Sequence, residues 1–141
     1  MSVDSKGRLA IPARHRDVLL RQYAPTMVLT LESDDHLLIY PEQHWLEVQS
    51  RLLKLPTGNP VLKAYQRLVL GHAETQQIDA SGRLLLPTVL RGLVNLTKEV
   101  ALVGMGNRFE LWDMERWQAQ TREALQIDRE QLAEQLGDFS L

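Results

Sequence analysis

The sequence predicts an α+β protein built from two tandem copies of one supersecondary unit. Segments 3–12 and 78–87 share Asp, Gly, Arg, Leu and Pro at matching positions when they are aligned without a gap. Apolar runs within 27–40 and 99–112 follow them, and Trp45 of the first copy falls opposite Trp117 of the second. A long period that occurs only twice indicates a duplicated unit, because a solenoid needs several stacked repeats.

The composition limits the classes of protein to be considered. The chain has 141 residues, of which 44% are hydrophobic, which is enough for a packed core. It contains no cysteine, so disulfides and thiolate metal sites are excluded, and a reducing cytoplasm is the simplest location. No segment approaches the roughly 18 apolar residues of a membrane span, and the N-terminus lacks a secretory signal pattern. We therefore expect a globular protein that does not bind membranes.

Charge is distributed unevenly along the chain. The net charge is −2, but residues 1–22 are basic overall and residues 108–141 are acidic overall. A weakly acidic protein can still present a basic face, and the local field is what attracts phosphates. The charges alone favour the simpler interpretation, in which both segments are solvated surfaces.

The first elements of each copy are predicted from a turn and a proline. Asp-x-x-Gly between apolar residues indicates a tight turn, since Asp can accept backbone N–H bonds and Gly tolerates a positive φ. A strand on each side of the turn follows. Pro12 and Pro87 then favour a helix start, where a missing N–H costs nothing. The turn-forming residues are Asp4, Gly7, Asp79 and Gly82.

Hairpins and longer helices complete each copy. Residues 33–35 and 104–107 are predicted turns between strands. Pro41 and Pro60 open two helices whose apolar positions, including Leu53, Val61 and Tyr65, are expected in the core. The segment from Met114 to about Leu136 is polar and prone to form a helix. These elements predict a first repeat over 1–45, a helical connector over 46–73, a second repeat over 74–117, and a C-terminal helix and tail over 118–141.

Basic side chains surround the two predicted turns. A guanidinium just past a tight turn stands at the tip of a ribbon, where it can donate two hydrogen bonds to a phosphate or to guanine. The alternative is that each arginine pairs with the aspartate of its own turn, which contributes only about 0–1 kcal/mol when exposed. Residue chemistry leaves both interpretations open. The candidate nucleic-acid contacts are Lys6, Arg8, Arg14, Arg16, Arg83 and Arg91.

The two copies differ in charge and in length. The first has Lys6 in the turn and Arg14-His15-Arg16 after the proline, while the second has Ser81 and only Arg91. We therefore expect the first turn to dominate phosphate binding. Only three residues precede Asp4, so the first strand is expected to be short and its turn less firmly held.

The sequence shows no pattern typical of a catalytic or metal-binding site. The four histidines, at 15, 36, 44 and 72, show no metal-ligand spacing and no paired acid. We predict that the protein is not an enzyme and has no cofactor, metal or small-molecule substrate.

The motif carries a resemblance to a known family. Asp-x-x-Gly-Arg-apolar-x-apolar-Pro, with a basic residue four past the proline at Arg16 and Arg91, resembles the AbrB/SpoVT swapped-hairpin DNA-binding domains. Two copies in one chain, with Leu-Gly-His-Ala at 70–73 leading into the second, resemble the MraZ family. The resemblance covers essentially the whole chain.

This resemblance implies both an architecture and a function. It implies two tandem swapped-hairpin β units packed as a pseudo-dimeric barrel with flanking helices. The implied partner is double-stranded DNA, at direct repeats upstream of the division and cell-wall gene cluster that contains the protein's own gene. It also implies a homo-oligomeric ring, an octamer or a dodecamer, in the cytoplasm and on the nucleoid. Arg8 and Arg83 match the DNA-facing arginines, and Asp4 and Asp79 match the turn formers.

Two other functions stay open beside this one. An antitoxin of the same fold would bind DNA and mask a toxin, although such proteins usually carry one motif and a disordered tail. A non-enzymatic oligomeric nucleoid or scaffold protein is the other alternative, and the basic first turn disfavours it.

Overall fold

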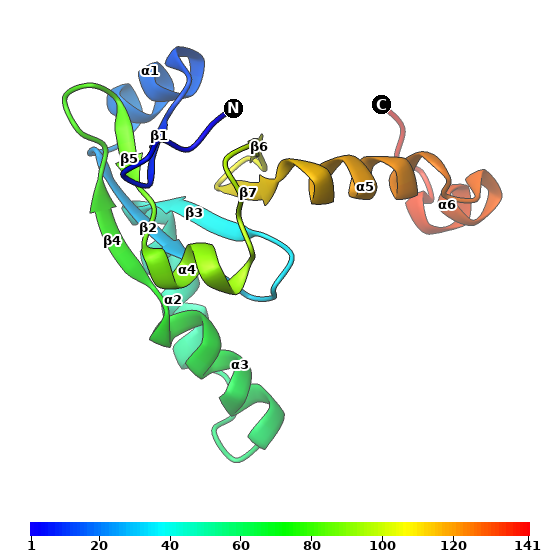
Figure 1. Cartoon of the computed structure of the whole chain (residues 1–141). Coiled ribbons are helices and arrows are strands. Elements are labelled where there is room, and N and C mark those ends of the chain that lie inside the picture. Colours follow the sequence, from blue (N-terminus) through cyan, green and yellow to red (C-terminus); the bar gives the residue numbers. More distant parts are fainter.

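A computed structural model describes residues 1–141 and contains two sheets and six helices (Figure 1). In chain order the elements are β1 (Arg8–Ala10), α1 (Ala13–Gln22), β2 (Thr26–Thr30), β3 (Leu37–Pro41), α2 (Glu42–Leu53), α3 (Pro60–Gly71), β4 (Glu74–Gln77), β5 (Arg83–Leu85), α4 (Thr88–Leu93), β6 (Val100–Gly104), β7 (Phe109–Asp113), α5 (Met114–Leu125) and α6 (Arg129–Leu136). The mixed α/β class and the tandem order of elements agree with the sequence prediction. None of the helices is both long and apolar enough to cross a membrane.

The two halves of the chain interleave in the sheets. A five-stranded antiparallel sheet has the order β4-β2-β3-β7-β6, so the β4 strand of the second half pairs with β2 of the first. At the opposite edge, Ser2 of the first half bridges Glu99, just before β6. The strands β1 and β5 pair only with each other, as a separate ribbon.

The expected closed barrel is not present. The strands form two sheets instead of one continuous cylinder. Each strand of the ribbon has only three residues, and Pro12 and Pro87, which offer no N–H, follow two residues after the strands end. The N-terminal segment links the ribbon to the edge of the larger sheet, because Val3 bridges Leu9 of β1 and Ser2 bridges Glu99.

The short segment before the first turn is anchored on the second half. The N–H of Val3 donates to the carbonyl of Lys98 at 2.8 Å, and the N–H of Val100 donates to Met1 at 2.8 Å. The Val3 side chain is only 7% exposed. The residues before Asp4 are thus tied to the segment 98–100 of the second half.

The core lies on both faces of the larger sheet. A cluster of 16 buried residues fills the space between this sheet, the ribbon and helices α1 and α4. A second cluster, which includes Val28, Trp45 and Leu52, lies between the opposite face and helices α2 and α3. Successive side chains of a strand point to opposite faces, so Met27 and Leu29 enter the first cluster and Val28 the second.

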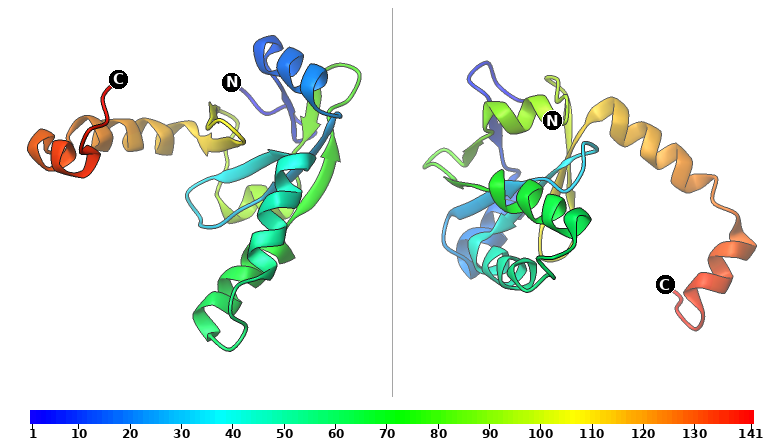
Figure 2. Two further views of the ribbon diagram at one scale, coloured as in Figure 1. Left: turned by 180° about the vertical axis from the view of Figure 1, so that it is seen from behind. Right: turned by 90° about the horizontal axis from the view of Figure 1, so that it is seen from below.

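The long helices extend beyond the sheet in both halves. Helices α2 and α3 form a hairpin. Leu53 of α2 and Val61 and Tyr65 of α3 were expected in the core, but all three are exposed. Helices α5 and α6 form an arm that projects from the body (Figures 1 and 2) and contains no buried residue. The predicted helical segment is interrupted before Asp128, whose carboxylate accepts from the N–H of Glu130 at 3.0 Å and caps α6.

Candidate functional site

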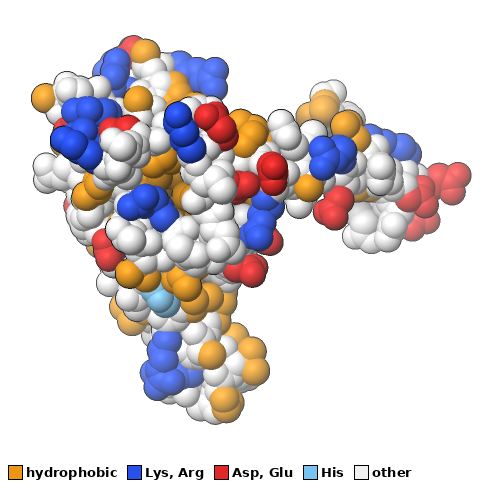
Figure 3. Space-filling model, in the orientation of Figure 1, with side chains coloured by type: hydrophobic (Ala, Val, Ile, Leu, Met, Phe, Trp, Pro, Cys, Tyr) orange, Lys and Arg blue, Asp and Glu red, His pale blue; other side chains and the backbone are white.

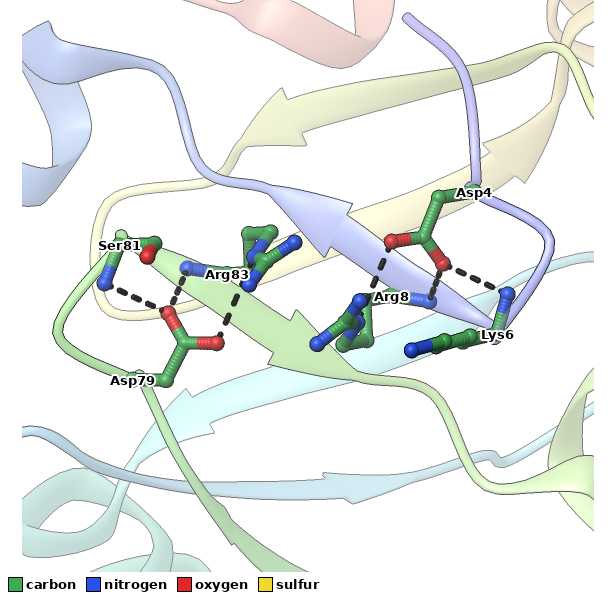
Figure 4. Close-up of polar contacts among 6 residues, drawn as sticks. All are labelled: Asp4, Lys6, Arg8, Asp79, Ser81 and Arg83. Atoms are coloured by element: carbon green, nitrogen blue, oxygen red, sulfur yellow. Dashed lines mark hydrogen bonds and ion pairs between the residues drawn. The ribbon is translucent and has the colours of Figure 1, made fainter.

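The first turn is closed by its aspartate. The Oδ1 atom of Asp4 accepts hydrogen bonds from the N–H groups of Lys6 at 2.9 Å and Arg8 at 2.8 Å (Figure 4). Gly7 has a φ of 80°, a conformation that side chains with a Cβ rarely adopt. The expected roles of Asp4 and Gly7 follow directly from these contacts.

The second turn repeats this geometry. The Oδ1 atom of Asp79 accepts from the N–H groups of Ser81 and Arg83, both at 2.9 Å. Gly82 has a φ of 77°. The duplication of the motif in sequence is therefore a duplication of one backbone turn.

Both aspartates are held in their charged form. Hydrogen bonds from backbone N–H groups, above all those of Arg8 and Arg83, keep the pKa values of Asp4 and Asp79 below their usual range. Each carboxylate therefore has a full negative charge at neutral pH, facing the arginine of its turn.

Each arginine pairs with the aspartate of its own turn through Nε. The distance from Arg8 Nε to Asp4 Oδ2 is 3.2 Å, and that from Arg83 Nε to Asp79 Oδ2 is 3.5 Å. The terminal nitrogens of both guanidinium groups form no hydrogen bond, and the side chains are 27% and 35% exposed. Each arginine thus pairs with the aspartate of its turn through Nε and also presents its terminal nitrogens to solvent. The two alternatives from the sequence analysis occur together.

The ribbon places both arginines on one face. Arg8 lies opposite Leu85 and Arg83 opposite Ala10, while the buried residues Leu9 and Leu84 face each other. Because side chains alternate along a strand, Arg8 and Arg83 project on the outer side of the ribbon. Figure 4 shows the two arginines near the middle of the ribbon, with both aspartates toward its ends.

A helix of the second half covers the first turn. The N–H of Leu86, at the end of β5, donates to the carbonyl of Gly7 at 2.8 Å. Helix α4 begins two residues later and brings Arg91 over the turn, where a Cβ added to Gly7 would lie 2.8 Å from Arg91 Nη2. The Arg91 guanidinium is held by the carbonyl of Leu86 at 3.1 Å and the hydroxyl of Thr88 at 3.2 Å.

A helix of the first half covers the second turn in the same way. Ile11 donates to the carbonyl of Gly82 at 2.9 Å, and Arg16 of α1 lies over Gly82. A Cβ added there would lie 2.7 Å from the Cδ atom of Arg16. By position in the sequence, Arg16 was grouped with the first turn and Arg91 with the second, and the structure exchanges the two: Arg16 lies at the second turn and Arg91 at the first.

Two other predicted residues lie at the protein surface. Lys6 is exposed at the tip of the first turn. Arg14 is exposed on α1, and its Nε contacts His15 Nε2 at 3.2 Å; it contacts neither turn. Lys and Arg side chains gather over α1, β1 and β5, whereas Asp and Glu side chains gather at the end of the arm (Figure 3).

Sequence reasoning missed one basic residue near the first turn. Lys98 lines an open hollow beside it, together with Asp4, Ser5 and Arg91. Nothing near Lys98 in sequence resembles the turn motif. Lys98 reaches the first turn because its backbone carbonyl accepts a hydrogen bond from Val3 of the N-terminal segment.

The four histidines lie apart from one another. His15 packs edge-to-face on Phe109, and His44 and His72 form hydrogen bonds with Tyr23 and with the carbonyl of Leu68. His36 stacks on Trp112, and its Nε2 lies 3.5 Å from Glu110 Oε2, so the expectation that no histidine has a paired acid is wrong for this residue. No group of three His, Asp or Glu side chains lies close enough together to hold a metal ion.

Comparisons with known proteins match the whole chain. The family described as "MraZ protein, putative antitoxin-like" matches twice, over residues 1–68 and 69–140. A protein named transcriptional regulator MraZ from Chromobacterium violaceum is 64% identical over 141 residues, which cover all of this chain and 95% of the relative. Proteins of the same name from Neisseria meningitidis serogroup C and Escherichia coli O127:H6 are 49% and 47% identical, again over all of this chain and over 94% and 95% of the relatives.

Proposed function

Because this chain belongs to the MraZ family, we propose that it is a sequence-specific DNA-binding transcriptional regulator that acts through the outer face of the β1–β5 ribbon. We further propose that the interleaved pairing of the two halves is a swapped-hairpin arrangement, with the tandem repeats acting as a pseudo-dimer. The cytoplasm and the nucleoid are the location that this function requires.

One observation carries the proposal. Arg8 and Arg83 share the outer face of a ribbon and keep their terminal nitrogens free for a partner. A planar guanidinium can donate two hydrogen bonds to guanine O6 and N7 or to a phosphate, and a two-stranded ribbon fits the major groove of B-DNA. Asp4 and Asp79 contact the Nε atoms of the two arginines and restrict their side chains before DNA binds. Less side-chain entropy is therefore lost on binding.

The surrounding basic residues would position the ribbon on the duplex. Phosphate contacts fix register and orientation, whereas base contacts read sequence. We assign the phosphate contacts to the four remaining basic residues of the predicted site, Lys6, Arg14, Arg16 and Arg91. We assign base reading to Arg8 and Arg83.

We propose that several chains act together as a ring of eight or twelve. A single ribbon neutralises few phosphates, and linked binding events gain strength from effective concentration. Apolar side chains are exposed on the arm and on the α2–α3 hairpin, where contacts between chains could cover them. They include Leu46, Leu53, Val61, Leu125, Ile127 and Phe139. The proposed targets are direct repeats upstream of the division and cell-wall gene cluster, before the protein's own gene.

A mobility-shift experiment tests DNA binding. The probe is the DNA upstream of the protein's own gene, and wild type is compared with Arg8→Ala at two salt concentrations. Wild type should shift the probe in preference to an unrelated duplex, and Arg8→Ala should weaken binding by about 1–3 kcal/mol, which is roughly fivefold or more. Arg122→Ala, which removes an exposed arginine from the arm, is the matched control. Equal binding by wild type and Arg8→Ala would refute the proposed site.

A change of repeat spacing tests the ring. Moving one DNA repeat by half a helical turn should reduce affinity sharply, because subunits fixed in a ring could then no longer all face their repeats. Native mass spectrometry gives the number of chains. A monomeric protein, or one repeat bound as tightly as three, would contradict the multivalent account.

A further inference from the structure

An open hollow lies beside the first turn and is built from both halves of the chain. It has a volume of about 620 Å³. The first half contributes Val3, Asp4 and Ser5, and the second contributes Arg91, Leu96, Thr97 and Lys98. The hollow adjoins the turn that presents Arg8, so a DNA backbone crossing the ribbon would pass close to it.

The two cations that line the hollow form no ion pair with an acidic side chain. Neither Arg91 nor Lys98 lies within 4.0 Å of an acidic side chain in an ion pair. The carboxylate of Asp4 is already engaged by two backbone N–H groups and by Arg8 Nε. The neighbouring Glu99 accepts from the hydroxyl of Ser2 at 3.0 Å and does not line the hollow.

Its donors suit a phosphate group. The Arg91 guanidinium is fixed by the carbonyl of Leu86 and the hydroxyl of Thr88, which leaves Nη1 free. Lys98 adds a mobile ammonium, and the Ser5 hydroxyl forms no hydrogen bond within the protein. The Thr97 hydroxyl is not available, because it donates to Asp113 Oδ1 at 2.6 Å. A planar cation, a point charge and a hydroxyl can together surround a phosphate oxygen.

The second turn lacks two of these three donors. At the first turn, the N–H of Val3 donates to the carbonyl of Lys98 at 2.8 Å. The matching bond at the second turn runs from the N–H of Ile78 to the carbonyl of Pro25 at 2.9 Å, so Pro25 stands where the first turn has Lys98. By the same alignment Ala80 stands where the first turn has Ser5. Of the three donors, the second turn keeps only the arginine, as Arg16.

We infer that Ser5, Arg91 and Lys98 form a subsite for a DNA backbone phosphate beside the first turn, so that this end of the ribbon is held to the duplex more firmly than the other. The inference rests on the proposed function.

The salt dependence of DNA binding tests the subsite. Lys98→Ala should weaken binding roughly fivefold to tenfold at 0.1 M salt and reduce the slope of log K against log salt by about 0.9, because one phosphate contact is lost. Lys54→Ala, which removes an exposed lysine after α2, should leave the slope unchanged. An unchanged slope in Lys98→Ala, with wild type still binding, would overturn this inference alone, whereas a wild type that binds no DNA would overturn the proposed function.

Inorganic phosphate distinguishes a backbone phosphate from a free anion. DNA-free wild type should bind inorganic phosphate only weakly in calorimetry. Tight binding of inorganic phosphate that Lys98→Ala abolishes, with DNA affinity unchanged, would overturn the inference.

Discussion

Around Asp4 and around Asp79 the chain builds the same turn, yet the two turns have different surroundings. The carboxylate accepts the same pair of backbone hydrogen bonds in each, and the glycines have nearly equal φ values of 80° and 77°. Beside the first turn lie Lys6, Arg91 and Lys98, and over the second lies Arg16. The turn geometry thus comes from a few local residues, whereas the charge around it comes largely from the other half of the chain.

The largest expected effect concerns the core beneath both turns. Leu9 and Leu84 face each other across the ribbon and are fully buried in one cluster. Leu9→Ala and Leu84→Ala should each lower the free energy of unfolding by about 2–5 kcal/mol. Urea denaturation at one protein concentration measures the change, with Leu20→Ala, on the exposed side of α1, as the control. A much smaller loss for Leu9→Ala would show that the first half is held less firmly than the second.

The next effect compares the two arginines in DNA binding. Arg8→Ala should weaken binding by about 1–3 kcal/mol and Arg83→Ala by less, because the first turn has more neighbouring cations to place the DNA. Mobility shifts at one salt concentration give the two affinities, and circular dichroism checks that both variants remain folded. Equal losses would mean that the difference in charge between the turns has no consequence for binding.

Glycine substitutions probe the turns themselves. Gly7→Ala and Gly82→Ala should each cost about 1–2 kcal/mol, because alanine is strained at these positive φ values and its Cβ would crowd Arg91 or Arg16. Thermal unfolding measures the loss. Gly58→Ala is the matched control, since nothing lies within 4 Å of an added Cβ there. If only one of the turn variants were destabilised, the two turns would not be equivalent.

The smallest effect is a dependence of stability on pH. Hydrogen bonds from Arg8 and Arg83 lower the pKa values of Asp4 and Asp79 below the unfolded value of 3.8. Their contribution is therefore present above pH 3.8 and is lost as the pH falls through the lower pKa of the folded protein. Asp4→Asn and Asp79→Asn should each reduce the loss of stability between pH 6 and pH 3 by a small and similar amount in urea denaturation. A variant with the full pH dependence of wild type would contradict this origin.

Local features were predictable from the sequence. The Asp4 carboxylate contacts residues two and four positions ahead, so the motif itself contains the turn. The helix starts after Pro12, Pro41 and Pro87 were predictable for the same reason, since the effect of proline on the backbone is local.

Features that depend on pairing between the halves were not predictable. The sequence places Arg16 twelve positions after Asp4, but the antiparallel ribbon carries it to the second turn. Lys98 has no motif around it and reaches the first turn only through its bond with Val3. The sequence also leaves open the role of the few apolar residues in the C-terminal arm, because a buried helix face and a face for another chain have the same spacing. These residues are Trp117, Leu125, Leu132 and Leu136.

The exchange of strands between the halves has a consequence for the order of folding. Residues 1–10, which include the first turn and β1, pair with β5 and with the segment 98–100. Synthesis proceeds at about 5–20 residues per second, so β5 and the segment 98–100 are made several seconds after the N-terminal segment with which they pair. Long-range pairing of this kind also slows folding. The ribbon that presents both arginines is therefore completed only after β5, which ends at Leu85, has been made.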